Sequence, residues 1–202
     1  MTDLSQNAQE LLAILNGCGQ FGKVELIGSV AELRHDQNSD IDLLLHDDSR
    51  APWENVQLAS DILECEKGCM LRDWAGSLLP EKYLISHFIP GWPIMRWVDL
   101  GCLPSYPHGA ISRSELHEDR DVHLAKLLVM NAKHYLRGSS GRLRIRDLYE
   151  KALRRSSAGL RDGQLFSGVF ESINFAEIDA TYRKELLSVL KQVANKALES
   201  SV

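Results

Sequence analysis

Asp40 and Asp42 are the residues of this sequence best suited to chemistry, because they interrupt an otherwise apolar segment, 39–45 (SDIDLLL), that is typical of a buried strand. Residues two apart in a strand point to the same side, so both carboxylates project from one face, about 6.6 Å apart along the chain. Isolated carboxylates in a buried strand cost several kcal/mol unless a cation meets them. The spacing therefore predicts a cation site on this face. The alternative is a pair of solvated carboxylates on an edge strand.

A third carboxylate, Asp99, lies in segment 93–100 (PIMRWVDL), where Met95, Trp97 and Asp99 share one face of an expected strand. If this strand neighbours the first, three carboxylates converge, and they would protonate or disorder without a cation. Two Mg²⁺ ions are the expected solution, because hard cations prefer oxygen ligands and phosphate oxygens complete their coordination. Paired metal ions stabilise the attacking and leaving oxygens of an in-line displacement, so the acids predict phosphoryl or nucleotidyl transfer. The other interpretation of Asp99 is a cap on the turn at Gly101.

A small-residue turn, Gly28-Ser29, precedes the two aspartates by a spacer of ten residues. Gly28 permits a close approach to the backbone, and Ser29 offers a hydroxyl and an N–H group. The residues that follow, 30–34 (VAELR), are expected to begin a helix whose N-terminus attracts phosphate. The turn therefore suits the phosphates of a nucleotide.

The elements that must position these residues follow from the periodicity of apolar side chains. The first half is predicted to contain a helix over 4–17, strands over 23–27 and 39–45, a helix over 53–66, and a hairpin of strands 83–89 and 93–100. Pro52 supports the start of the second helix, and Pro90-Gly91 marks the hairpin turn.

Helical periodicity replaces the strand signals beyond the Gly/Pro-rich segment 101–110. Apolar faces predict helices near 122–136 and 148–153 and a long terminal helix over 178–197. We therefore expect a boundary within 105–115 between a sheet-containing part and a helical part.

Charge and composition limit the function classes. The first 105 residues carry a net charge of −9 and the remainder +4, so the two halves present differently charged surfaces. Four scattered cysteines are too few for a disulfide framework, and Cys65 and Cys69 with His87 lack the second matching pair of a zinc site. The sequence has no apolar run of membrane-spanning length and no signal-peptide pattern, so we expect a cytoplasmic protein without membrane association.

Gly28-Ser29, its spacing to the Asp40-Ile41-Asp42 motif, and Asp99 within WVDL together resemble the signature of the polymerase-β-type nucleotidyltransferase superfamily. The resemblance covers about the first hundred residues. It implies an α+β fold, with a small mixed β-sheet core and flanking helices followed by a C-terminal helical bundle. The implied domains are a catalytic domain over 1–108 and a helical domain over 109–202.

The resemblance also implies roles for residues of this sequence. Gly28 and Ser29 would hold the triphosphate, and Asp40, Asp42 and Asp99 would be the metal ligands and catalytic residues. Asp99 would also accept the proton of the acceptor hydroxyl. Two Mg²⁺ ions and an NTP substrate, expected to be ATP, follow from these roles.

The turn departs from the common family pattern, which often carries a basic residue and a glycine after Gly-Ser, where Val30, Glu32 and Leu33 stand in this sequence. Arg34 is the residue expected to replace the missing basic contact to the nucleotide. By family analogy, a lysine early in the helical part, Lys126, is expected to reach the nucleotide phosphates, although a lysine at a helix surface is the plain alternative.

A helical domain behind such a catalytic domain is similar to the antibiotic nucleotidyltransferases that adenylylate aminoglycosides or lincosamides. This similarity implies transfer of AMP to a hydroxyl of a small molecule and a role in antibiotic resistance, and the acidic first half suits a cationic acceptor. Nine Lys and Arg residues within 133–161 form either a solvated helical face or a surface for RNA. An RNA or protein acceptor, and a non-catalytic nucleotide-binding or antitoxin partner, remain the alternatives, and no motif defines the oligomeric state.

Overall fold

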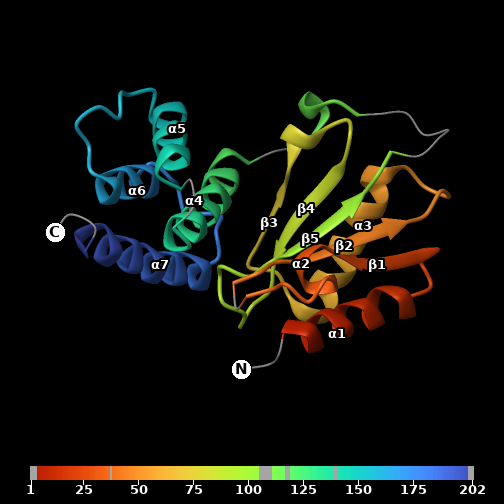
Figure 1. The fold of residues 1–202 in the computed structure, drawn as a ribbon. Helices are drawn as coiled ribbons and strands as arrows, with labels where there is room; N and C mark the ends of the chain where they lie inside the picture. Colours follow the sequence, from red (N-terminus) through yellow and green to blue (C-terminus); the bar gives the residue numbers. More distant parts are fainter. Residues whose placement is uncertain (1–3, 37, 105–110, 117–118, 139–140, 200–202) are drawn as a thin grey trace. The chain divides into compact units, whose positions relative to one another are not determined.

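The computed structural model describes five stretches of the chain, residues 4–36, 38–104, 111–116, 119–138 and 141–199. Its contacts divide the chain into two compact units, Met1–Glu118 and Asp119–Val202. The first unit contains a five-stranded mixed sheet with flanking helices, and the described part of the second is helical, so the predicted α+β fold class is confirmed (Figure 1). The domain boundary predicted between residues 108 and 109 lies outside the described residues.

The first unit is built around the sheet. Its elements in chain order are α1 (Leu4–Gly17), β1 (Lys23–Ile27), α2 (Gly28–Ala31), β2 (Ile41–His46), α3 (Pro52–Lys67), β3 (Leu71–Trp74), the 3₁₀ turn Gly76–Leu78, β4 (Tyr83–Phe88), β5 (Val98–Cys102) and the 3₁₀ turn Arg113–Glu115. The strand order is β1-β2-β5-β4-β3. β2 and β5 run parallel, and the other three pairs are antiparallel, so the expected pairing of β4 with β5 as a hairpin is confirmed.

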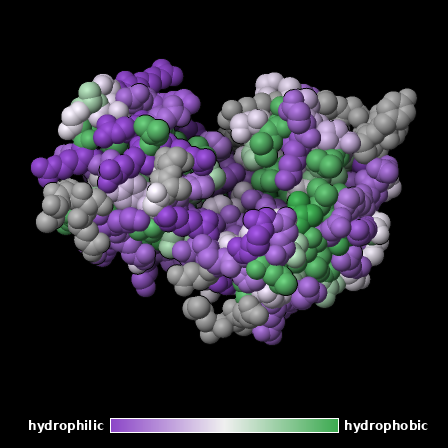
Figure 2. Space-filling model, in the orientation of Figure 1, coloured by the Kyte–Doolittle hydropathy of each residue, from purple (hydrophilic) through white to green (hydrophobic). Residues whose placement is uncertain are grey.

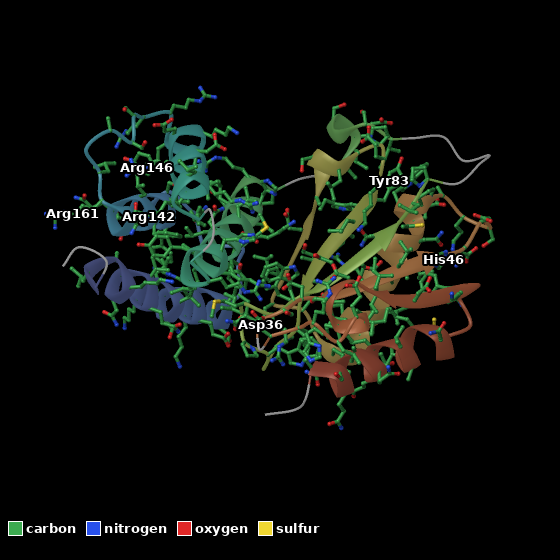
Figure 3. All side chains as sticks on the ribbon, viewed as in Figure 1. Asp36, His46, Tyr83, Arg142, Arg146 and Arg161 are labelled. Atoms are coloured by element: carbon green, nitrogen blue, oxygen red, sulfur yellow. The ribbon has the colours of Figure 1, made fainter. Side chains whose placement is uncertain are left out.

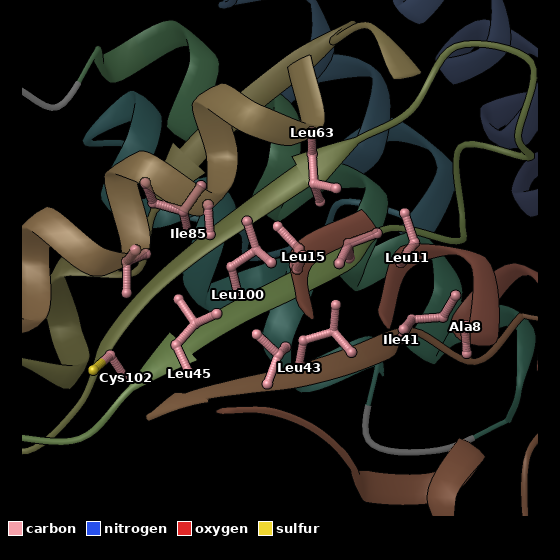
Figure 4. Packing of buried hydrophobic residues seen from close by; sticks show 14 of the residues in the cluster. Ala8, Leu11, Leu15, Ile41, Leu43, Leu45, Leu63, Ile85, Leu100 and Cys102 are labelled. Atoms are coloured by element: carbon pink, nitrogen blue, oxygen red, sulfur yellow. The ribbon is translucent and has the colours of Figure 1, made fainter. Parts of the chain in front are cut away.

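The hydrophobic core lies between one face of the sheet and the helices α1 and α3 (Figure 4). On β2, Ile41, Leu43 and Leu45 point into this core and are at most 2% exposed. Each such side chain contributes about 1.5–3 kcal/mol through burial. A one-residue slip of β2 would place Asp42 in the core, so this burial fixes the face on which the carboxylate projects.

The predicted strand 93–100 is shorter than expected, because β5 begins at Val98. Pro93 starts a turn in which the N–H of Arg96 donates to the Pro93 carbonyl at 2.8 Å. Trp97 is buried within this segment, at 3% exposure. The prediction that Met95 and Trp97 lie within the strand is therefore wrong, although Trp97 does lie on the side of Asp99, to which its Nε1 donates a hydrogen bond. β3 was not predicted at all, because its four residues, LRDW, show no apolar alternation.

The second unit contains α4 (Arg120–Leu136), α5 (Gly141–Leu153), α6 (Asp162–Glu171) and α7 (Ala180–Glu199). The Asp119 carboxylate caps α4 by accepting hydrogen bonds from the N–H groups of Asp121 at 2.8 Å and Val122 at 3.0 Å. The best-buried side chains of the second unit include Leu128, Ala132, Phe166, Tyr182 and Val193. The face of this unit seen in Figure 2 is mostly hydrophilic. No helix in the described stretches is long and apolar enough to cross a membrane.

His87 ties α3 to the core face of the sheet. Its Nδ1 lies 3.1 Å from the Ser60 hydroxyl, its Nε2 lies 3.1 Å from the Gly68 carbonyl, and the residue is fully buried. Burial lowers the pKa of His87, with smaller opposing contributions from the Gly68 carbonyl and nearby acids. The folded protein therefore holds this imidazole neutral.

Stability is expected to fall in mild acid because of His87. Below about pH 6.5 the unfolded chain binds a proton at this histidine that the folded chain does not, so the free energy of unfolding decreases as the pH drops through that value and recovers above it. Urea denaturation at a series of pH values measures this slope. His87→Gln should flatten it, and an unchanged slope in that variant would contradict the assignment.

Candidate functional site

Asp42 and Asp99 lie side by side on neighbouring strands. The parallel pairing of β2 with β5 places Asp42 opposite Asp99, with Leu43 opposite Leu100 in the next position. Leu43 and Leu100 face the core, so the two carboxylates project from the opposite face of the sheet. Adjacent strands are about 4.8 Å apart, which brings like charges into close range.

Asp40 directly precedes β2, two residues before Asp42. The N–H of Ile41 donates to the Trp97 carbonyl at 3.0 Å and so extends the β2 and β5 pairing to this position. A turn that begins at Asp36 delivers the chain to β2, because the Asp36 carboxylate accepts from the Asn38 N–H at 2.9 Å and from the Ser39 hydroxyl at 3.1 Å. Asp36, labelled in Figure 3, is a positioning residue that the sequence analysis missed.

The turn at Gly28 contacts the carboxylate of Asp42. Gly28 follows Ile27, which pairs with Asp42 across β1 and β2, and it adopts a φ of +71°. A Cβ at this position would lie 2.3 Å from Asp42 Oδ2. Glycine therefore leaves the space beside this oxygen that any other residue would fill. Ser29 is the next residue, so the predicted turn lies beside one of the predicted acids, Asp42.

The turn is shorter than the helix expected over 30–34. α2 spans only Gly28–Ala31, and the chain reverses through Leu33, which has a φ of +56° and is 80% exposed. The N–H of Arg34 donates to the Ser29 carbonyl at 2.9 Å and closes this reversal. The left-handed conformation costs a residue with a Cβ about 1–2 kcal/mol, which explains why glycine suits the Leu33 position.

Two donors converge on one oxygen of Asp99. The Ser86 hydroxyl donates to Asp99 Oδ1 at 2.6 Å, and Trp97 Nε1 donates to the same atom at 3.1 Å. Both donors are buried, at 2% and 3% exposure. The Trp97 ring in turn packs against Phe88, with ring centroids 5.4 Å apart. These contacts hold the Asp99 carboxylate in one orientation, in which Oδ1 accepts from both donors and Oδ2 accepts from neither.

Ser86 and Asp73 extend the polar row across the sheet. Ser86 on β4 lies opposite Asp99 on β5, and Asp73 on β3 lies opposite Ser86. Asp73 is 4% exposed, which is unusual for a carboxylate. Neither residue stands out by its spacing in the sequence, and the signal for Ser86 is a serine within the apolar run YLISHFI.

The donor set suits a hard cation, since aspartate oxygens are the ligands that such cations prefer, and the lack of a side chain at Gly28 leaves Asp42 Oδ2 unobstructed from that position. Within the described stretches, however, no group of three or more His, Cys, Asp and Glu side chains has the arrangement of a metal site. The structure thus pairs Asp42 with Asp99, and the joining of Asp40 to them around a metal ion stays a prediction.

Arg34 and Lys126 have different surroundings from those expected. Arg34 is exposed and forms an ion pair with Glu32, which offsets its positive charge. Lys126 is 6% exposed on α4, so it is not a lysine extended into solvent, and it belongs to the second compact unit. Contact of either residue with a nucleotide stays a prediction.

The cysteines do not form a zinc site with His87. Both ring nitrogens of His87 already lie within hydrogen-bonding distance of Ser60 and Gly68. Burial raises the pKa of the Cys69 thiol to about 11, so it stays protonated near neutral pH.

Comparisons with known proteins show a distant structural likeness. No family model matches the sequence, and neither does any curated protein. Among solved structures, the chain is similar to the polymerase core of TRAMP, an RNA surveillance complex, with a TM-score of 0.36 and 14% sequence identity. The match covers 93% of this chain and 55% of that one, so the chain spans little more than half the length of that protein.

Gly28→Ala is expected to displace the Asp42 carboxylate, because the new Cβ would meet Oδ2. We expect Mn²⁺ affinity, measured by electron paramagnetic resonance, to fall about tenfold or more, on the scale of disturbing a metal ligand's immediate support. Gly19→Ala is the matched control, since Gly19 has a φ of +67° and a Cβ there would meet nothing within 4 Å. Equal affinities in the two variants would show that the contact with Asp42 is unimportant.

Ser86→Ala removes the shorter of the two hydrogen bonds to Asp99. Losing the orienting partner of a ligand typically costs about 10- to 100-fold in metal affinity, so Mn²⁺ binding should weaken on that scale. Ser60→Ala removes another fully buried serine hydroxyl, on the core side of the sheet, at a similar stability cost of about 1 kcal/mol. Weakened binding in both variants would indicate a general structural effect instead.

Proposed function

We propose that this chain is a Mg²⁺-dependent nucleotidyltransferase that moves a nucleoside monophosphate, AMP in the first instance, from an NTP to a hydroxyl group. The observation that carries the proposal is the pairing of Asp42 with Asp99 beside the Gly28 turn. Two carboxylates held together on one sheet face favour the binding of a cation, and a neighbouring glycine turn suits phosphate.

Asp40, Asp42 and Asp99 would hold the metal ions, and Gly28 and Ser29 would contact the phosphates. Bound Mg²⁺ would neutralise phosphate charge and stabilise the attacking and leaving oxygens. Asp99 is the residue best placed to orient the acceptor hydroxyl and accept its proton, because two buried donors fix its carboxylate. Most of the rate enhancement would come from positioning and charge neutralisation.

A small cationic molecule is the acceptor that the charge distribution favours. The first 105 residues carry a net charge of −9, which would steer a cation towards the sheet. Aminoglycosides fit this description, and lincosamides are the related class that the sequence resemblance suggests. A role in antibiotic resistance is part of this proposal and depends on the acceptor.

Asp42→Asn and Asp99→Asn should each abolish transfer while leaving the fold intact. Both substitutions keep the side-chain shape but remove a charge, so we expect the rate to fall at least about a hundredfold, the scale of losing one preorganised electrostatic contact. Pyrophosphate release from each of the four NTPs with Mg²⁺, across a panel of acceptors, measures the effect.

Asp61→Asn is the matched control, since Asp61 is an exposed acid of α3 that forms an ion pair with Arg72. It should retain the wild-type rate. Circular dichroism confirms that each variant is folded. Turnover that survives in either Asp42→Asn or Asp99→Asn would refute the proposed chemistry.

A further inference from the structure

A pocket of about 780 Å³ runs along α6 within the second unit. Its walls are one face of α6 and part of α7, including Gly163, Ser167, Glu171, Ala194, Ala197 and Leu198. From Gly163 to Glu171 the helix rises about 12 Å. The volume and the mixture of small apolar residues with a few polar groups are typical of a small-molecule site.

Three arginines surround one end of this pocket. Arg142 and Arg146 come from α5, and Arg161 directly precedes α6 (Figure 3). Asp162 accepts from Arg142 Nε at 3.1 Å and lies 3.7 Å from Arg146 Nη2, so one carboxylate serves two guanidinium groups. Arg161 is exposed and forms no ion pair with any other described residue. This end of the pocket therefore keeps an excess of positive charge.

The arginines are held in place by neutral partners as well. Arg146 donates to the carbonyls of Ser157 and Leu160, each at 3.2 Å. The Tyr135 hydroxyl donates to Asp162 at 3.2 Å, and burial together with this carboxylate raises the pKa of Tyr135, so the hydroxyl keeps its proton. The cationic end is thus preorganised, which lowers the entropy lost when an anion binds.

We propose that this pocket binds an organic phosphate. The phosphate group would lie among Arg142, Arg146 and Arg161, because guanidinium groups bind phosphate through paired hydrogen bonds. The N-terminus of α6, with the partial positive charge of its helix dipole, lies at this end as well. The body of the ligand would follow the small residues of α6 and α7 towards Glu171, which can accept a hydrogen bond from an amino group. This assignment is independent of nucleotidyl transfer by the first unit.

The open space at Gly163 supplies a sharp test. Gly163 lines the pocket and a Cβ there would meet nothing within 4 Å, so the side chain of Gly163→Leu has room at its base and should occupy pocket volume. Titration of the full chain with AMP, followed by backbone amide NMR at Gly163 and Ser167 without Mg²⁺, reports binding here and not in the first unit. A short oligoribonucleotide and inorganic phosphate are titrated in parallel.

We expect AMP to shift these resonances in the wild type, Arg161→Ala to weaken binding about tenfold or more, and Gly163→Leu to abolish it. Arg144→Ala is the matched control, since Arg144 is an exposed arginine of α5 outside the pocket lining, and it should bind as the wild type does. Much tighter binding of the oligonucleotide than of AMP would identify an RNA strand as the source of the phosphate. Equal binding of the two would identify a free nucleotide as the source. Absence of shifts with all three probes, or binding that survives in Gly163→Leu, would overturn the proposal.

Discussion

The parallel pairing of β2 with β5 is the constraint on which the candidate site depends. It places Asp42 opposite Asp99 and, in the next position, Leu43 opposite Leu100. The leucines face the core and the aspartates face away from it, so the same register that buries the apolar side chains gathers the acids. The folding energy of the core therefore offsets the repulsion between two carboxylates, and a ligand of opposite charge would relieve that repulsion.

The elements around this pair each fix one part of it. β1 brings Gly28 against Asp42, β4 brings Ser86 to Asp99, and the Asp36 turn sets where β2 begins. None of these contacts requires the second unit, so the first unit carries the whole of the described arrangement. The second unit has its own core and its own cationic pocket, and it could serve a separate ligand.

The alternation of Asp40 and Asp42 with apolar residues was enough to predict β2 and the face of the sheet on which Asp42 lies. Helices α1, α3, α4 and α7 were predictable for the same reason, because their apolar residues recur at helical spacing over ten or more positions. β3 has only four residues without apolar alternation, and the apolar residues of α6 recur at helical spacing over too few positions to identify a helix. The start of β5 was placed too early because the apolar residues of 93–97 are buried in a turn. The apolar pattern of a sequence indicates which residues are buried, so a buried turn can give the same pattern as a buried strand.

Contacts between strands could not be predicted from local pattern. The hydrogen bonds from Ser86 and Trp97 to Asp99 depend on strand register and on the turn before β5, and neither is encoded within a few residues. The reversal at Leu33 is similar, since a leucine gives no sign that its φ will be positive. The Gly-Ser turn was recognisable because glycine is the residue that such a close approach requires.

Anomalous diffraction from crystals of the full chain, grown with Mn²⁺ and a non-hydrolysable NTP analogue, would show whether Asp42 and Asp99 bind a metal ion together. We expect a manganese peak bound by oxygens of both Asp42 and Asp99, with phosphate oxygens beside Gly28 and Ser29. A manganese peak elsewhere, or these two carboxylates on different faces of the sheet, would contradict this expectation.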